Sequence, residues 1–199
     1  MRNLMSQLLA KHQVIFMYLI LITIPFLFGG CYAPVIEGAQ QGYDATKRVQ
    51  LKNEIKTNDF EKQYELGNTY CCKGGGPLND LSIYDNNKAT YWYCKAARKG
   101  YGPAQLQLAK LYSGHAIRGL HIALRASSAI GDVNTNLSVA LMWARRASLN
   151  KHDVDIEDAV ELRDDISKKA TEQEVSKTEA LSSNWQTVAC EWKEVFPNN

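Results

Sequence analysis

The stretch KATYWYCKAARKGYGPAQLQLAKLY, residues 88–112, decides the fold. Its small and aromatic residues recur every three or four positions, as on one face of a helix. These residues are Ala89, Trp92, Tyr93, Ala96 and Ala97. Lys99 and Gly100 then form a basic last turn and a helix-stop glycine, and Pro103 suits the first turn of another helix. The stretch therefore predicts two helices joined by a short turn.

The same pattern occurs on both sides of this stretch. Upstream, aromatic and small residues of 60–70 have helical spacing, and the segment KGGGPLND (73–80) ends that helix. Downstream, ALMWARRAS (140–148) repeats ATYWYCKAA (89–97) at an offset of 51, whereas Tyr112 follows Tyr70 at an offset of 42. Repeated helix pairs of this size indicate hairpins that stack into a solenoid.

A set of small and aromatic residues is expected to form the scaffold of these hairpins. Residues without bulk let helix axes approach closely, and aromatic rings fill the wedge between successive hairpins. The set comprises Leu66, Gly67, Tyr70, Ala89, Trp92, Ala96, Tyr112, Ala140, Trp143 and Ala147. Trp92 and Trp143 are expected to have equivalent surroundings.

The hairpin sequences resemble the Sel-one-like repeat, a relative of the tetratricopeptide repeat. YELGNTY (64–70) and KATYWYCKAARKG (88–100) match its pattern closely, while the second unit departs from it at Ala109, Ala144 and Ser148. The resemblance covers residues 59–185. It implies an all-α fold: a short right-handed α-solenoid of antiparallel helix hairpins with N- and C-terminal capping helices.

The resemblance also implies an organisation of the chain into four parts. Residues 1–30 are a leader, residues 31–58 a polar tether that becomes helical towards Asn53–Lys56, residues 59–152 the repeats, and residues 153–199 the C-terminal capping helices. With two repeats only, the array needs flanking helices to close it, because stable arrays usually contain three or more.

The leader predicts export and lipid attachment. Arg2 and Lys11 precede fifteen apolar residues from Val14 to Phe28, which suit a signal-peptide core better than a bilayer-spanning helix of about 20 residues. FGGC (28–31) resembles the lipobox of bacterial lipoproteins, with Cys31 as the lipid acceptor, although Phe28 stands where an aliphatic residue is usual. The alternative is a short membrane anchor. Tyr32, by the same resemblance, favours the outer membrane, facing the periplasm.

Composition excludes a nucleic-acid-binding protein. The chain has 199 residues, 45% hydrophobic and 22% charged, as in an ordinary globular domain. Beyond residue 31 it carries 21 basic and 21 acidic side chains, whereas a nucleic-acid footprint needs a basic face.

Four cysteines remain after Cys31, namely Cys71, Cys72, Cys94 and Cys190. In an oxidising compartment they can form disulfides in three complete pairings. The hairpin geometry favours a bond from Cys71 or Cys72 to Cys94, with the other meeting Cys190. Free buried thiols are the alternative, and the spacing fits neither a zinc site nor a thioredoxin-like motif.

No motif indicates catalysis, a metal or a cofactor. KGGG (73–76) lacks the Lys-Ser/Thr of a phosphate-binding loop, and G-x-S-x-G is absent. The segment HAIRGLHIALRAS (115–127) departs from the repeat pattern, and we interpret it as a partner-binding insertion or a plain inserted helix. Its candidate binding residues are His115, Arg118, His121 and Arg125.

These features predict a non-catalytic, lipid-anchored envelope protein that binds a protein partner and no nucleic acid. The family resemblance offers a sharper alternative, an immunity lipoprotein that neutralises a secreted phospholipase-type toxin. A hydrolase of envelope glycans or lipids is a second alternative, but no motif singles out the pair of carboxylates that glycosidic hydrolysis needs.

Overall fold

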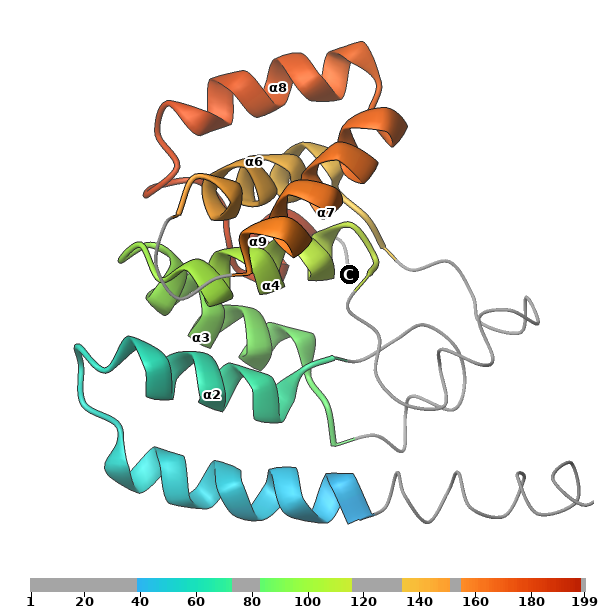
Figure 1. Ribbon diagram of the computed structural model, residues 1–199. Helices are drawn as coiled ribbons and strands as arrows, with labels where there is room; N and C mark the ends of the chain where they lie inside the picture. Colours follow the sequence, from blue (N-terminus) through green and yellow to red (C-terminus); the bar gives the residue numbers. More distant parts are fainter. Residues whose placement is uncertain (1–38, 73–82, 116–133, 151–154, 198–199) are drawn as a thin grey trace, which may run out of the picture. The chain divides into compact units, whose positions relative to one another are not determined.

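A computed structural model describes residues 39–72, 83–115, 134–150 and 155–197 (Figure 1). These residues form helices and connecting turns, and none of them is in a strand, which confirms the all-α class. The helices are a segment over residues 39–54, α2 Phe60–Tyr70, α3 Asn86–Ala97, α4 Gly102–Tyr112, α6 Leu137–Ser148, α7 Ile156–Lys169, α8 Glu172–Ser182 and α9 Trp192–Val195. The contacts discussed lie within one compact unit that begins at Gln41.

The helix pairs α2–α3 and α4–α6 match residue by residue. Both first helices have 11 residues with bounds 42 apart, and both second helices have 12 residues with bounds 51 apart. One backbone hydrogen bond closes each pair. Asp85 N–H donates to Tyr70 O at 2.9 Å, and Asn136 N–H donates to Tyr112 O at the same distance. The two offsets read from the sequence are thus the offsets of the helices themselves.

The second helix of each pair begins at a side-chain cap. The Asp85 carboxylate accepts a hydrogen bond from Lys88 N–H at 3.1 Å, and the Asn136 amide oxygen accepts one from Val139 N–H at 3.2 Å. Such caps satisfy backbone donors that the first turn leaves free. The cap of α3 is therefore Asp85, and the two asparagines that follow it are already in the helix.

From α2 to α7, described helices that follow one another in the chain pack against each other, as Figure 1 shows for α2, α3 and α4, whereas α8 packs on α6 and α9 on α3. The helix over residues 39–54 is longer than the helical turn expected near Asn53. Its residues contact α2, because Lys47 lies 3.2 Å from Glu65 and the Arg48 guanidinium lies 3.9 Å from the centre of the Tyr70 ring. The buried side chain of Leu51 anchors the same segment.

Most of the scaffold residues are buried, with one exception. Nine of the ten are buried: Leu66, Gly67, Tyr70, Ala89, Ala96, Tyr112, Ala140, Trp143 and Ala147. Trp92 is only partly buried, whereas Trp143 is completely buried. The expectation that the two tryptophans have equivalent surroundings is therefore wrong, because Trp185 packs against Trp143 with ring centres 6.2 Å apart.

Gly67 lets α2 approach the ring of Tyr93 on α3. A methyl group at residue 67 would lie 2.5 Å from Cε1 and 2.6 Å from Cδ1 of that ring. The ring cannot retreat easily, because it is completely buried and its hydroxyl donates a hydrogen bond to Asn68 at 2.8 Å. At the matching positions of the second pair stand Ala109 and Ala144, both fully buried. The departures from the repeat pattern at Ala109 and Ala144 therefore compensate for each other. Without a large ring at residue 144, no glycine is needed at residue 109.

We expect Gly67→Ala to destabilise the protein by about 1–3 kcal/mol, the usual cost of overpacking a core. Urea unfolding followed by far-UV circular dichroism measures this loss. The same change made in a Tyr93→Ala background should cost nothing or stabilise, because the clashing ring is gone and alanine is the better helix former. Equal losses in both backgrounds would show that the ring is not what requires the glycine.

Candidate binding site

A pocket of about 370 Å³ lies between α3 and the turn that joins the residue 39–54 helix to α2. Trp92 and Lys95 come from α3 and Lys99 from the turn directly after it, and their spacing of three and four residues places them along one stripe. The complete lining is Ile55, Lys56, Thr57, Gln63, Trp92, Lys95 and Lys99. This stripe is offset from the buried Ala89–Tyr93–Ala96 face, so it is free to contact other molecules.

The pocket is cationic. Among the residues that the structure describes, none of the ammonium groups of Lys56, Lys95 and Lys99 lies within 4 Å of a carboxylate. The nearby acids Glu54 and Asp59 both contact Lys62 instead, at 3.3 and 3.8 Å. Three exposed cations around one hollow attract an anionic group and repel a cationic one.

An aromatic surface adjoins these charges. The Lys95 ammonium lies 4.4 Å from the centre of the Tyr91 ring and 4.8 Å from that of Trp92, and the two rings meet edge to face. Tyr91 is 38% exposed, which makes it one of the few large exposed apolar side chains among the described residues. Partly exposed aromatic rings are enriched at surfaces that bind other proteins.

Sequence reasoning did not single out this pocket. It treated Lys95 and Lys99 as parts of a repeat pattern and Trp92 as core, and it gave no role to Lys56 or Gln63. The signal that was present is the spacing of Trp92, Lys95 and Lys99, which places an aromatic residue and two cations on a stripe outside the alanine face. The contribution of the turn before α2 depends on tertiary packing.

Of the predicted insertion residues, the structure describes only His115. Arg118, His121 and Arg125 lie outside the described residues, as does Cys31. His115 Nε2 lies 3.1 Å from an Asp165 oxygen on α7, and its Nδ1 lies 2.8 Å from Ser113 Oγ. A hydrogen bond from Lys169, with further help from His115, holds the pKa of the Asp165 carboxyl below its usual range.

This serine, histidine and aspartate lie in a row, yet their setting does not suit acyl transfer. Ser113 is buried directly after α4, and its hydroxyl also donates to Ala109 O at 2.7 Å. The C-terminal end of a helix carries the negative end of its dipole, which would oppose an oxyanion at this serine. Together with Lys110 and Asp158, 2.5 Å apart, the row links α4 to α7.

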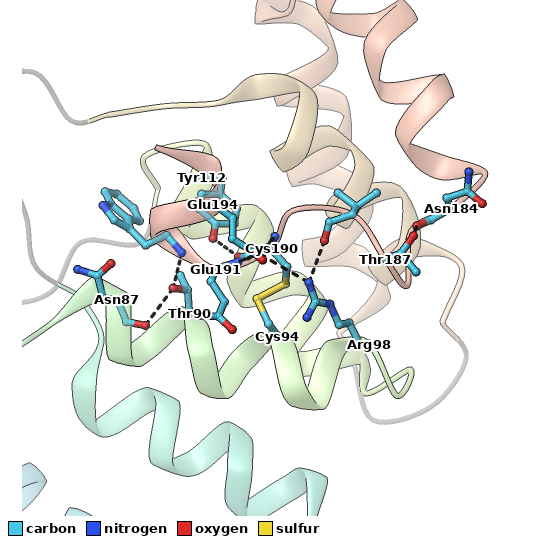
Figure 2. A network of polar contacts seen from close by, with 12 residues as sticks. Asn87, Thr90, Cys94, Arg98, Tyr112, Asn184, Thr187, Cys190, Glu191 and Glu194 are labelled. Carbon is cyan, nitrogen blue, oxygen red and sulfur yellow. Dashed lines mark hydrogen bonds and ion pairs between the residues drawn. A yellow bond between two sulfur atoms is a disulfide. The ribbon is translucent and has the colours of Figure 1, made fainter. Parts of the chain in front are cut away.

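The cysteines pair differently from the expected pattern. The structure joins Cys94 to Cys190, with 5.8 Å between their Cα atoms, and joins Cys71 to its neighbour Cys72. The reason is the direction in which Cys94 points. Thr90, Cys94 and Arg98 recur every four residues on one face of α3, and Figure 2 shows that this face meets the C-terminal segment rather than α2.

Polar contacts hold this C-terminal segment in place. Trp192 N–H donates to Thr90 Oγ1 at 2.8 Å, Arg98 donates to Val188 O at 3.0 Å, and the Tyr112 hydroxyl donates to Cys190 O (Figure 2). Burial raises the pKa of Tyr112 far above its usual value, so the hydroxyl stays protonated as a donor. These contacts are structural, because Tyr112 is completely buried.

A carboxylate completes the same region. Glu194 accepts hydrogen bonds from the backbone N–H groups of Cys190 and Glu191 at 2.8 and 2.9 Å, and it lies 3.6 Å from Arg98. Partial burial by itself raises the pKa of Glu194, but these donors and the arginine outweigh it, so the pKa lies below its usual value. Glu194 is therefore ionised at neutral pH and neutralises Arg98.

The described ranges are residues 39–72, 83–115, 134–150 and 155–197. Within them, no cluster of three or more histidine, cysteine or acidic residues has the geometry to hold a metal ion. No helix in the same ranges has the length and apolar character needed to cross a membrane.

Comparison with models of known families, with curated proteins and with solved structures finds no match to this chain.

Proposed function

We propose that this chain is a non-catalytic, lipid-anchored protein of the bacterial cell envelope that binds a protein partner through a helical repeat scaffold. The observation that carries the binding role is the cationic pocket beside Trp92. It combines a partly exposed ring with three lysines that have no carboxylate partner among the described residues.

The scaffold in this proposal is a short right-handed α-solenoid that resembles Sel-one-like repeats. The matching bounds of α2–α3 and α4–α6 support this arrangement, as does the hydrogen bond that closes each pair. The residue 39–54 helix would cap one end, and α7 and α8 would cap the other. A rigid array of this kind presents side chains at fixed spacings to a partner.

The lipid anchor is supported by the leader sequence. Val14–Phe28 has the length of a signal-peptide core, and FGGC ends at Cys31. More than one acyl chain anchors a protein stably, because each methylene group buried in the membrane adds about 0.8 kcal/mol to the free energy of binding. Metabolic labelling with a fatty acid tests this part, because Cys31→Ala should abolish the label. An unchanged label would contradict the assignment to outer-membrane lipoproteins.

Photo-crosslinking in living cells tests the binding role. A photoreactive amino acid introduced at Lys99 should form an adduct with one protein, whereas the same amino acid at the exposed and remote Lys177 should not. Mass spectrometry of the adduct identifies the partner and also tests the alternative of a secreted phospholipase-type toxin. If position 99 forms no adduct, or the same adducts as position 177, the proposed function is wrong.

A further inference from the structure

The pocket beside Trp92 has a counterpart in the second helix pair. The offset of 42 carries Lys56 and Gln63 onto Arg98 and Gln105, and the offset of 51 carries two residues of α3 onto α6 and Lys99, after α3, onto Asn150, after α6. These three pairs are Trp92 and Trp143, Lys95 and Arg146, and Lys99 and Asn150. Four of the seven lining positions therefore keep their chemical type, namely tryptophan, glutamine and two cations, whereas Lys99 corresponds to Asn150 and Ile55 and Thr57 correspond to Ala97 and Lys99.

The two glutamines make similar contacts. The Gln63 amide donates to Thr57 O at 2.8 Å, and the Gln105 amide donates to Ala97 O at 3.1 Å. In each pair the side chain thus binds a backbone oxygen upstream of its own helix, although the two acceptors are not at matching positions, since residue 57 corresponds to residue 99. A ligand that fits one of the two sites should meet the same arrangement of groups at the other.

The chain itself covers the second site. Trp185 meets Trp143 edge to face at an angle of 84°, and the Arg146 guanidinium lies 4.2 Å from the centre of the Trp185 ring. Three residues later, Val188 O accepts the hydrogen bond from Arg98 at 3.0 Å. Figure 2 shows the turn from Asn184 to Thr187, which includes residue 185 and directly precedes Val188.

From this internal example we infer that the pocket beside Trp92 binds an aromatic side chain of a partner's peptide segment. The ring would lie against Trp92 and under Lys95, as Trp185 lies against Trp143 and under Arg146. Lys56 would bind a carbonyl or carboxylate about three residues further along the segment, in the role of Arg98. This inference rests on the proposed function and specifies the chemistry of the partner.

The charges around the two sites indicate which residues flank the aromatic side chain in the partner. At the second site the covering C-terminal segment supplies an acid of its own, because Glu194 lies 3.6 Å from Arg98, and Asn150 is neutral. At the first site Lys56, Lys95 and Lys99 have no carboxylate partner among the described residues. We therefore expect acidic residues to flank the aromatic residue of the partner.

A labelled peptide tests this inference directly. The probe is fluorescein-labelled Ser-Asp-Trp-Glu-Thr-Val-amide, which keeps the spacing of the chain's own turn and adds two acids. Fluorescence anisotropy with the full chain in detergent should show saturable binding. Replacing the peptide's tryptophan with alanine should weaken binding by about tenfold or more, because the ring contact and the cation above it are both lost.

Variants of the protein assign the binding to this pocket. Lys95→Glu with Lys99→Glu should weaken binding about tenfold or more, whereas Lys177→Glu should leave it unchanged. All three lysines are exposed, so the fold should persist, and circular dichroism checks this. Trp92→Leu should weaken binding of the tryptophan peptide but should hardly affect the alanine peptide.

Three results would overturn the inference: no binding of the probe, binding that ignores the ring, or binding that ignores the lysine pair. Self-association of the chain that Trp92→Leu abolishes would also overturn it, since the occupant would then be a second copy. The proposed function fails separately. An adduct at position 99 without ring-dependent peptide binding would support the proposed function and contradict this inference. Ring-dependent peptide binding without any adduct in cells would support this inference and contradict the proposed function.

Discussion

Trp143→Ala should destabilise the protein by about 3–5 kcal/mol, the usual cost of removing a completely buried aromatic side chain. Trp92→Ala should cost only about 1–2 kcal/mol, because Trp92 is partly exposed and less apolar surface is lost. Urea unfolding followed by circular dichroism at 222 nm, a wavelength dominated by the helical backbone, measures both losses on the same scale.

The comparison is matched, because both tryptophans stand at the same position of a 12-residue helix. Trp143→Phe serves as a control for the cavity, since it keeps a ring and should cost less than Trp143→Ala. Equal losses for the two alanine variants would mean that Trp185 does not distinguish the surroundings of the two rings. The internal example used for the pocket beside Trp92 would then have no basis.

Removal of the disulfide by Cys94→Ser with Cys190→Ser should cost about 4–5 kcal/mol. The bond joins residues 96 positions apart, and closing a loop of that length removes much of the conformational entropy of the unfolded chain. Unfolding in urea under non-reducing conditions measures the loss. The wild-type protein should lose a similar amount when it is reduced with excess dithiothreitol.

Cys71→Ser with Cys72→Ser is the control for this experiment. These cysteines are also buried, but they are adjacent, so a bond between them constrains the unfolded chain little. We therefore expect a much smaller loss. A non-reducing peptide map should contain the Cys94–Cys190 peptide pair. Its absence, or equal losses in the two double variants, would contradict the pairing in the structure.

The helices themselves could be predicted from local sequence. The spacing of Ala89, Tyr93 and Ala96 identifies the buried face of α3, and the offsets of 42 and 51 give the bounds of the matching helices. Even Gly67 could be interpreted correctly as a site of close approach, because small residues on a helical face favour it. Each of these features depends on neighbours within a few turns of helix.

The candidate pocket could be predicted only in part. Its stripe on α3 is visible as Trp92, Lys95 and Lys99, but Trp92 fits the core pattern equally well. Trp92 meets only the ring of its neighbour Tyr91, and among the described residues no ring from a distant segment lies against it as Trp185 lies against Trp143. Periodicity within one helix cannot show what a distant segment will cover.

By itself, the sequence determined that this protein is all-α, where its matching helix pairs begin and end, and which small residues lie between them. Those properties follow from hydrophobic spacing and capping, which act over a few residues. Only the tertiary structure decided that Cys94 meets Cys190 and that Trp185 covers Trp143 but not Trp92. These contacts join residues 96 and 42 positions apart, and they depend on where the folded scaffold directs its C-terminal segment.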